Sequence, residues 1–101
     1  MTSFDETVRR SLDSLPPDIA AKLENVAVVV EDENAEDPHV FGLFEQRAYL
    51  PARIAIYRRP LEAEFGDDSL ALEREIRVTV LHEVAHYFGI DEARLDELGY
   101  A

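Results

Sequence analysis

Two histidines in the C-terminal third of this 101-residue chain, His82 and His86, stand four residues apart in an apolar stretch. On an α-helix, residues at this spacing project from one face, one turn above the other. Two such imidazoles can reach a single tetrahedral metal ion, for which zinc is the usual occupant. The spacing therefore predicts one Zn²⁺ ion per chain, with His82 and His86 as two of its ligands.

Glu83 follows the first histidine and lies about 100° around the helix axis from it. That position places a carboxylate beside the metal without making it a ligand, where it can act as a general base toward water. The H-E-x-x-H pattern is typical of zinc-dependent peptide hydrolysis. The plain alternative is that all three are ordinary core or surface residues. A metal is favoured because polar groups in so apolar a segment need partners; its apolar members are Val78, Val80, Leu81, Val84, Ala85 and Phe88.

The motif requires a long helix, which the sequence predicts over residues 70–88, with Ser69 as its N-cap and Gly89 as a left-handed stop. The break at residues 66–68 separates it from a short helix that begins at Pro60 and ends at Phe65. Beyond Gly89 the chain turns back. There Asp91 is expected to cap a last helix that carries Leu95 and Leu98.

The first quarter of the chain predicts two packing helices. Residues 3–6 form a capping box, and apolar residues then recur at helical spacing until Pro16-Pro17 ends the helix. Pro17 can open a second, shorter helix to residue 23. The residues of the first helical stripe are Phe4, Val8, Leu12 and Leu15.

Three strands are predicted at residues 26–30, 40–44 and 53–57, with residues 48–50 as a further hairpin partner. The continuous valine run of the first strand is typical of a strand covered on both faces. The alternation in residues 53–57 indicates a half-buried strand instead. The fold class is therefore α+β, in which helices pack with a small twisted sheet of about three or four strands in one domain, residues 1–101.

Composition limits the functions that this chain can have. There is no cysteine, which excludes disulfides and Cys-type zinc sites. The net charge of −12 opposes binding to nucleic acid and to anionic membranes. The N-terminus shows no signal peptide and no apolar run could span a bilayer, so a cytoplasmic location is the default expectation. The acidic run at residues 31–38 predicts a solvated loop rather than a second metal site, and the isolated His39 is assigned no role.

Over nearly its whole length, the chain resembles the minimal zincin-like metallopeptidases of bacteria. The residues that carry the resemblance are the segment 82–92 and Glu97-Leu98-Gly99. Upstream blocks are similar as well, at Leu15-Pro16, Asn25-Val26, Gly42-Leu43-Phe44 and residues 51–58.

The resemblance implies a pared-down zincin fold and a third metal ligand soon after Gly89. Families of this pattern usually place His or Asp where this chain has Glu92. Glu92 is therefore the expected third ligand, and Asp91, Asp96 and Glu97 are competing carboxylates. By analogy with larger zincins, the strand through Ile54 and Tyr57 is the expected binding edge for an extended peptide.

On this interpretation, the chain is a zinc metallopeptidase in which Glu83 deprotonates a zinc-activated water that attacks a peptide or protein substrate. Tyr57, Tyr87 and Tyr100 are candidates for the group that stabilises the oxyanion. One alternative is a zinc-stabilised module that binds proteins without catalysis. A zinc-dependent endoribonuclease is less favoured, because that family lacks a glutamate after its first histidine and because this chain is acidic.

Overall fold

The computed structural model describes residues 3–89, Ala93 and Glu97. The helices of this part are α1 (Phe4–Asp13), α2 (Pro17–Lys22), α3 (Arg58–Phe65) and α4 (Ser69–Phe88), and the strands are β1 (Ala27–Glu31), β2 (Gly42–Glu45) and β3 (Arg53–Tyr57). The α+β class is confirmed, and the sheet, predicted with about three or four strands, has three in the described part of the chain. The predicted last helix after Gly89 lies outside the described residues, as do Tyr100 and the carboxylates at 91, 92 and 96.

The three strands form one mixed sheet in the order β1-β3-β2. Strand β3 pairs with β1 in parallel and with β2 in antiparallel. Strand β3 is therefore the central strand, and four of its five residues are buried. Strand β1, in contrast, is an edge strand whose residues are all half-buried. The two burial predictions were thus reversed: the valine run is not covered on both faces, and the alternating strand is the buried one.

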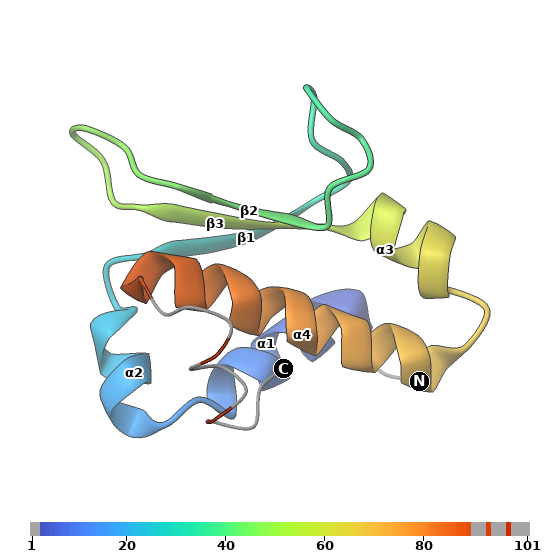
Figure 1. The fold of residues 1–101 in the computed structure, drawn as a ribbon, viewed down its shortest axis with the longest axis horizontal. Coiled ribbons are helices and arrows are strands. Elements are labelled where there is room, and N and C mark those ends of the chain that lie inside the picture. The colour runs from blue at the N-terminus through green and yellow to red at the C-terminus, as the bar shows by residue number, and fades with distance from the viewer. Residues whose placement is uncertain (1–2, 90–92, 94–96, 98–101) are drawn as a thin grey trace.

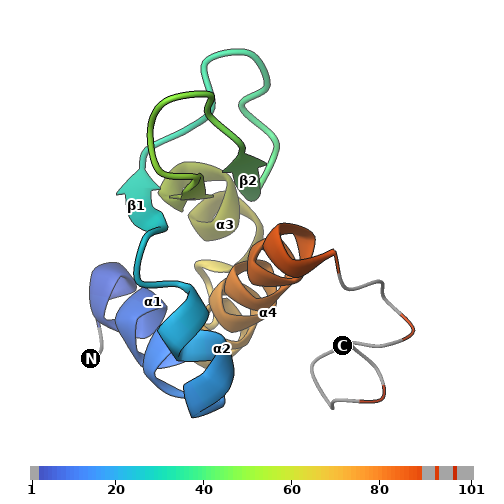
Figure 2. The ribbon, with the colours of Figure 1, turned by 90° about the vertical axis from the view of Figure 1, so that its left-hand side faces the viewer.

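The long helix α4 runs along one face of the sheet, and α1 packs beside it (Figure 1). The view down one end shows α1, α2 and α4 all on the same side of the sheet (Figure 2). The opposite face carries no helix in this part of the chain, and the long connection between β1 and β2 rises on that side. The fold therefore buries one face of α4 against the sheet along most of the helix.

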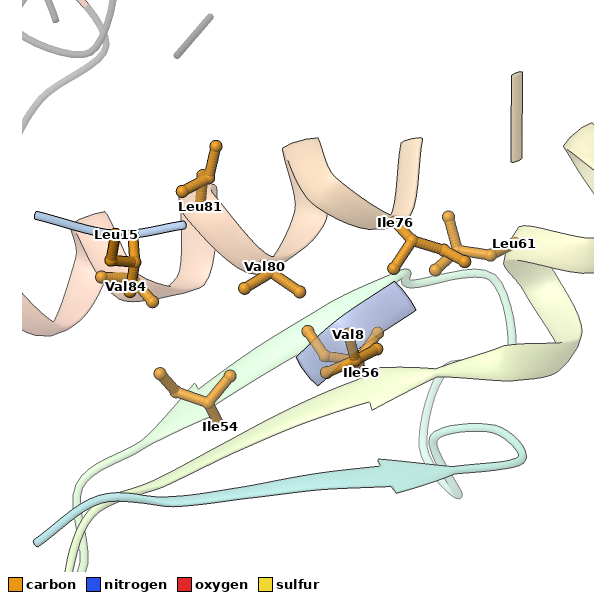
Figure 3. Close-up of a cluster of buried hydrophobic side chains, with 9 residues drawn as sticks. All are labelled: Val8, Leu15, Ile54, Ile56, Leu61, Ile76, Val80, Leu81 and Val84. Carbon is orange, nitrogen blue, oxygen red and sulfur yellow. The ribbon is translucent and has the colours of Figure 1, made fainter. Parts of the chain in front are cut away.

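The hydrophobic core lies between β3 and α4. Ile54 and Ile56 point from β3 toward Val80 on α4, and Leu61 from α3 joins Ile76 at the other end (Figure 3). All five of these side chains are at most 1% exposed. Because packing at this density tolerates little displacement, the core fixes α4 and its side chains relative to the strands.

Local sequence signals explain most of the element ends. Ser3 caps α1, since its hydroxyl accepts a hydrogen bond from the Glu6 amide at 3.1 Å. The cap of α4 is Asp68 rather than the predicted Ser69, because the Asp68 carboxylate accepts from the amides of Leu70 and Ala71. Gly89 ends α4 in the left-handed conformation, with φ of 67°, as predicted.

Two other boundaries differ from the predictions. Helix α3 begins at Arg58, two residues before the expected Pro60, because the chain passes directly from β3 into the helix. Residues 48–50 form no strand and lie in the connection between β2 and β3, where Tyr49 is 99% exposed. No helix in the described part of the chain is long and apolar enough to cross a membrane.

Candidate active site

The H-E-x-x-H segment occupies the last turns of α4, just before Gly89. Helix α4 packs against both β2 and β3. Val80 and Val84 are buried in the core and hold this part of the helix in place. His82, Glu83 and His86 are thus carried on a rigid helix rather than on a loop.

The three motif residues differ in burial. Glu83 is buried, with 8% of its surface exposed, and His82 is half-buried. His86 is exposed, and 63% of its side-chain surface is accessible. The expectation that both histidines lie in a buried stretch was therefore wrong for His86. His86 is accessible although its neighbours Val84 and Ala85 on α4 are buried.

Glu83 and His86 contact each other across one helical turn. The Glu83 Oε1 atom lies 3.3 Å from His86 Nδ1, at the long end of hydrogen-bond distances. If the hydrogen of the neutral imidazole is on Nδ1, the Nε2 atom keeps a free lone pair. That tautomer is one that can bind a metal, and a carboxylate beside the other ring nitrogen is a common way to select it.

Gly42 allows β2 to approach α4 closely at Glu83. A Cβ atom at this position would lie 3.0 Å from Glu83 Cγ, 3.0 Å from Thr79 Cγ2 and 3.2 Å from the Ala55 carbonyl oxygen. Such distances are shorter than carbon atoms tolerate without movement of a neighbour. The absence of a side chain at Gly42 is therefore what lets the Glu83 carboxylate lie under the strand.

A cavity of about 440 Å³ opens beside the motif. The segment that leads into β2 forms one wall and α4 forms the other; the lining residues are His39, Val40, Phe41, Gly42, Glu75, Val78, Thr79, His82 and Glu83. Its size falls within the range of small-molecule and peptide sites. The structure thus brings His82 and Glu83 to a space large enough for a substrate group.

His39 is the residue of this cavity that the sequence analysis left without a role. It is exposed and follows Pro38, and its amide donates a hydrogen bond to Asp37 Oδ1 at 3.0 Å. His39 is 43 positions before His82 along the chain, so no spacing signal could have connected them. Only the pairing of β2 with β3 and the packing of α4 bring the two histidines to one cavity.

The described residues, Glu97 among them, contain no group of three His, Cys, Asp or Glu side chains that could hold a metal ion. His82 and His86 are brought to one helix face, as the motif requires. The other three candidates for the third ligand, Asp91, Glu92 and Asp96, lie outside the described part of the chain. Two imidazoles from one helix are a donor set that suits zinc, and a third ligand has to come from another segment.

The two candidate tyrosines in the described part of the chain, Tyr57 and Tyr87, make contacts away from the cavity. Tyr57 is buried, and its hydroxyl accepts a hydrogen bond from Asn34 Nδ2 at 3.1 Å. Its side chain lines a different hollow, so Tyr57 was the wrong candidate for stabilising the oxyanion. Tyr87 packs edge-on against the rings of Phe44 and Phe88, at 5.6 and 4.9 Å between centroids. Neither tyrosine lines the cavity beside Glu83.

Comparison with known protein families agrees with the motif and the fold. The model of a family described as zincin-like metallopeptidase matches residues 23–100, which is well over half of the chain. This chain therefore belongs to the zincin-like metallopeptidase family, whose usual cofactor is zinc and whose substrates are peptides or proteins. No curated protein matches the chain.

Proposed function

We propose that this protein hydrolyses peptide bonds with one zinc ion and with Glu83 as the general base. The observation that carries the proposal is the position of Glu83. This carboxylate is buried, lies next to His82 and His86 on a rigid helix, and lines a cavity of about 440 Å³. A buried carboxylate at the wall of a substrate-sized cavity is placed for proton transfer rather than for solvation.

His82, His86 and Glu92 would hold the metal. The two histidines share one face of α4, and Glu92 follows the left-handed turn at Gly89 by three positions. When bound, zinc would polarise the substrate carbonyl and lower the pKa of a bound water toward neutrality. This donor set leaves one tetrahedral position open for that water, as catalytic zinc sites require.

Glu83 performs the proton transfers. Its carboxylate takes a proton from the attacking water and then delivers it to the amine that leaves. Its burial between Gly42 and Thr79 restricts its motion, so the carboxylate stays near the position that it must have during both transfers. His39 lies on the opposite wall of the cavity and is the group placed to donate a hydrogen bond to the substrate carbonyl oxygen.

The substrate-binding strand differs from the expected one. The strand through Ile54 and Tyr57 is the central strand β3, and its two edges are already paired with β1 and β2. Strand β2 is an edge strand that contacts α4 and carries Gly42 next to Glu83. We therefore assign the extended peptide to the outer edge of β2, where backbone hydrogen bonds can add a strand.

The test separates metal binding from proton transfer. Zinc-loaded wild-type protein is incubated with a peptide library, and any cleaved peptide is used to measure the Glu83→Gln variant. This variant should keep one zinc per chain and lose at least about a hundredfold in kcat. Glu64→Gln, an exposed position on α3, makes the same change in charge and should leave both quantities unchanged.

Two outcomes would contradict the proposal. Loss of zinc from Glu83→Gln would make Glu83 a ligand, and the base would have to be another residue. A wild-type protein that binds zinc and cleaves no peptide would favour the alternative of a zinc-stabilised module that binds proteins.

A further inference from the structure

The cavity beside Glu83 extends well beyond the motif. Glu75 lies at its far end, seven residues before His82 on α4, which corresponds to about 10 Å along the helix axis. Val78 and Thr79 lie between these two residues on the same helix. The cavity is therefore an elongated space that begins at the proposed catalytic residues and ends at a second carboxylate.

The walls between the two ends are mostly apolar. Val40, Phe41 and Val78 line them, and the ring of Phe41 is held in place by Phe65 at 5.9 Å between centroids. The Thr79 hydroxyl donates back to the Glu75 carbonyl oxygen at 2.8 Å, and its methyl group faces β2 at Gly42. A hydrocarbon chain would thus contact these walls without leaving a polar group unpaired.

The charge at the far end is negative and weakly compensated. Among the described residues, the cation near Glu75 is Arg74, whose Nε lies 3.9 Å from Glu75 Oε1 and whose side chain is 72% exposed. An exposed pair at this distance contributes little. The lining residues include Glu75 and Glu83 but no lysine or arginine, and the basic side chains of the lining are His39 and His82.

We propose that this cavity is the specificity pocket of the enzyme and takes the lysine or arginine side chain of the residue that flanks the cleaved bond. This inference rests on the proposed peptidase function. An extended lysine side chain places its ammonium roughly 6 Å from its own Cα. With the peptide on β2 and its carbonyl at His82, such a side chain lies along Val40 and Val78 and ends at Glu75. The stem is buried on apolar surface and the charged head pairs with a carboxylate, which is how long basic side chains are usually accommodated.

The experiment measures binding as well as cleavage. Two fluorescent peptides, identical except for a central lysine or its uncharged analogue norleucine, are titrated into zinc-loaded Glu83→Gln protein, which should bind peptide without cutting it. The lysine peptide should bind about tenfold more tightly. Adding Glu75→Gln should remove the difference, and adding Glu75→Lys should reverse it. Adding Glu64→Gln removes the same charge outside the cavity and should leave the preference intact, which excludes general attraction to an acidic protein.

The outcomes distinguish this inference from the proposed function. Equal binding of the two peptides, or a preference that survives Glu75→Gln, would overturn the specificity pocket whether or not the wild type is a peptidase. Cleavage of both peptides with equal kcat/KM would overturn it too, and the peptidase function would stand. A lysine preference that depends on Glu75, in a protein that cleaves no peptide, would support the pocket and contradict the hydrolysis.

Discussion

Two hollows in the described part of the protein each contain two or more carboxylates, and the partners of these carboxylates differ. The first is the cavity beside the motif, which contains Glu75 and Glu83. The second, of about 370 Å³, lies on the sheet face away from α4 and is lined by four glutamates together with Arg53 and Tyr57. In the second hollow an arginine stands among the carboxylates, whereas in the first the basic groups are histidines.

The carboxylates of the second hollow and of the nearby start of α3 are paired with arginines. Arg53 Nη2 donates to Glu31 Oε1 at 2.7 Å, and this hydrogen bond raises the pKa of the Arg53 guanidinium. Arg58, the first residue of α3, makes two similar contacts at 2.6 Å. One is with Asp32, which follows β1, and the other is with Glu62 on α3. Each of these carboxylates is paired with a permanent cation, and the Arg58 guanidinium lowers the pKa of the Asp32 carboxyl.

The carboxylate of the motif, Glu83, has a different kind of partner. In the described part of the chain, the ion-pair partner of Glu83 is the His86 imidazole, 3.3 Å away, rather than a guanidinium. This arrangement agrees with the proposal that Glu83 transfers protons and that His82 and His86 bind zinc. The comparison teaches that this acidic chain separates its carboxylates by partner: those that support the fold are paired with arginines, and the one in the proposed site is next to a histidine.

The largest expected effect comes from removing the histidines next to Glu83. His82→Ala and His86→Ala should each abolish zinc binding, because two ligands from one helix cannot be replaced by water without loss of affinity. Zinc content of the purified variants checks this directly. Chelation should also lower the melting temperature of the wild type and leave that of the variants unchanged. Full zinc occupancy in either variant would remove the site from this end of α4.

The third ligand gives the next effect. Glu92→Ala should weaken zinc binding at least tenfold, about 1.4 kcal/mol, whereas Asp91→Ala should change the affinity little and lower helix stability. The reason is the left-handed turn at Gly89, after which a residue three positions on can return toward His82 and His86. Zinc titrations of the two variants decide the matter, and the reverse pattern would assign the ligand to Asp91.

A smaller effect tests the position of Glu83. Gly42→Ala adds a carbon atom 3.0 Å from Glu83 Cγ, so the strand or the carboxylate must move. Overpacking of this kind should cost about 1–3 kcal/mol of folding free energy. The displaced base should also lower kcat, while zinc content stays at one per chain. A variant that loses stability and keeps its full kcat would show that Glu83 does not depend on close contact with β2.

The sequence predicted the fold class, the long helix and its stop at Gly89, because these follow from local patterns of apolar residues and caps. Strand burial was predicted wrongly, since it depends on strand order: the valines of β1 are at an edge, and Ile54 and Ile56 of β3 are at the centre. The prediction that the strand through Ile54 and Tyr57 binds an extended peptide at a free edge was wrong for the same reason, because β3 is paired on both sides. Order within a sheet is set by long-range pairing, which alternation along a single strand does not encode.

For the candidate site, the sequence predicted roles for His82, Glu83 and His86, whose shared helix makes spacing informative; these roles stay predictions. It gave no signal for Gly42, His39 and Glu75 as parts of the same cavity. Gly42 and His39 reach the cavity through the approach of β2 to α4, and neither has a fixed spacing from His82. Glu75 shares α4 with the motif, but it is not part of the H-E-x-x-H pattern. The parts of a site that lie on one helix can thus be read from the sequence, and the opposite wall requires the structure.

The smallest expected effect comes from removing an arginine that is paired with carboxylates. The Arg58 guanidinium, through a hydrogen bond and its charge, lowers the pKa of the Asp32 carboxyl below its usual value. A carboxyl whose pKa is lower in the folded state stabilises the protein above its unfolded pKa of about 4, and this contribution disappears as the pH falls through the folded value. Arg58→Gln should therefore lower the melting temperature slightly at pH 7 and by progressively less below pH 4. Because both partners are largely exposed, the difference at pH 7 should also shrink in 1 M salt.

Zinc content and kcat should be unchanged, since Arg58 lies outside the motif cavity. A loss of activity in Arg58→Gln without loss of stability would contradict the separation of the two groups of carboxylates.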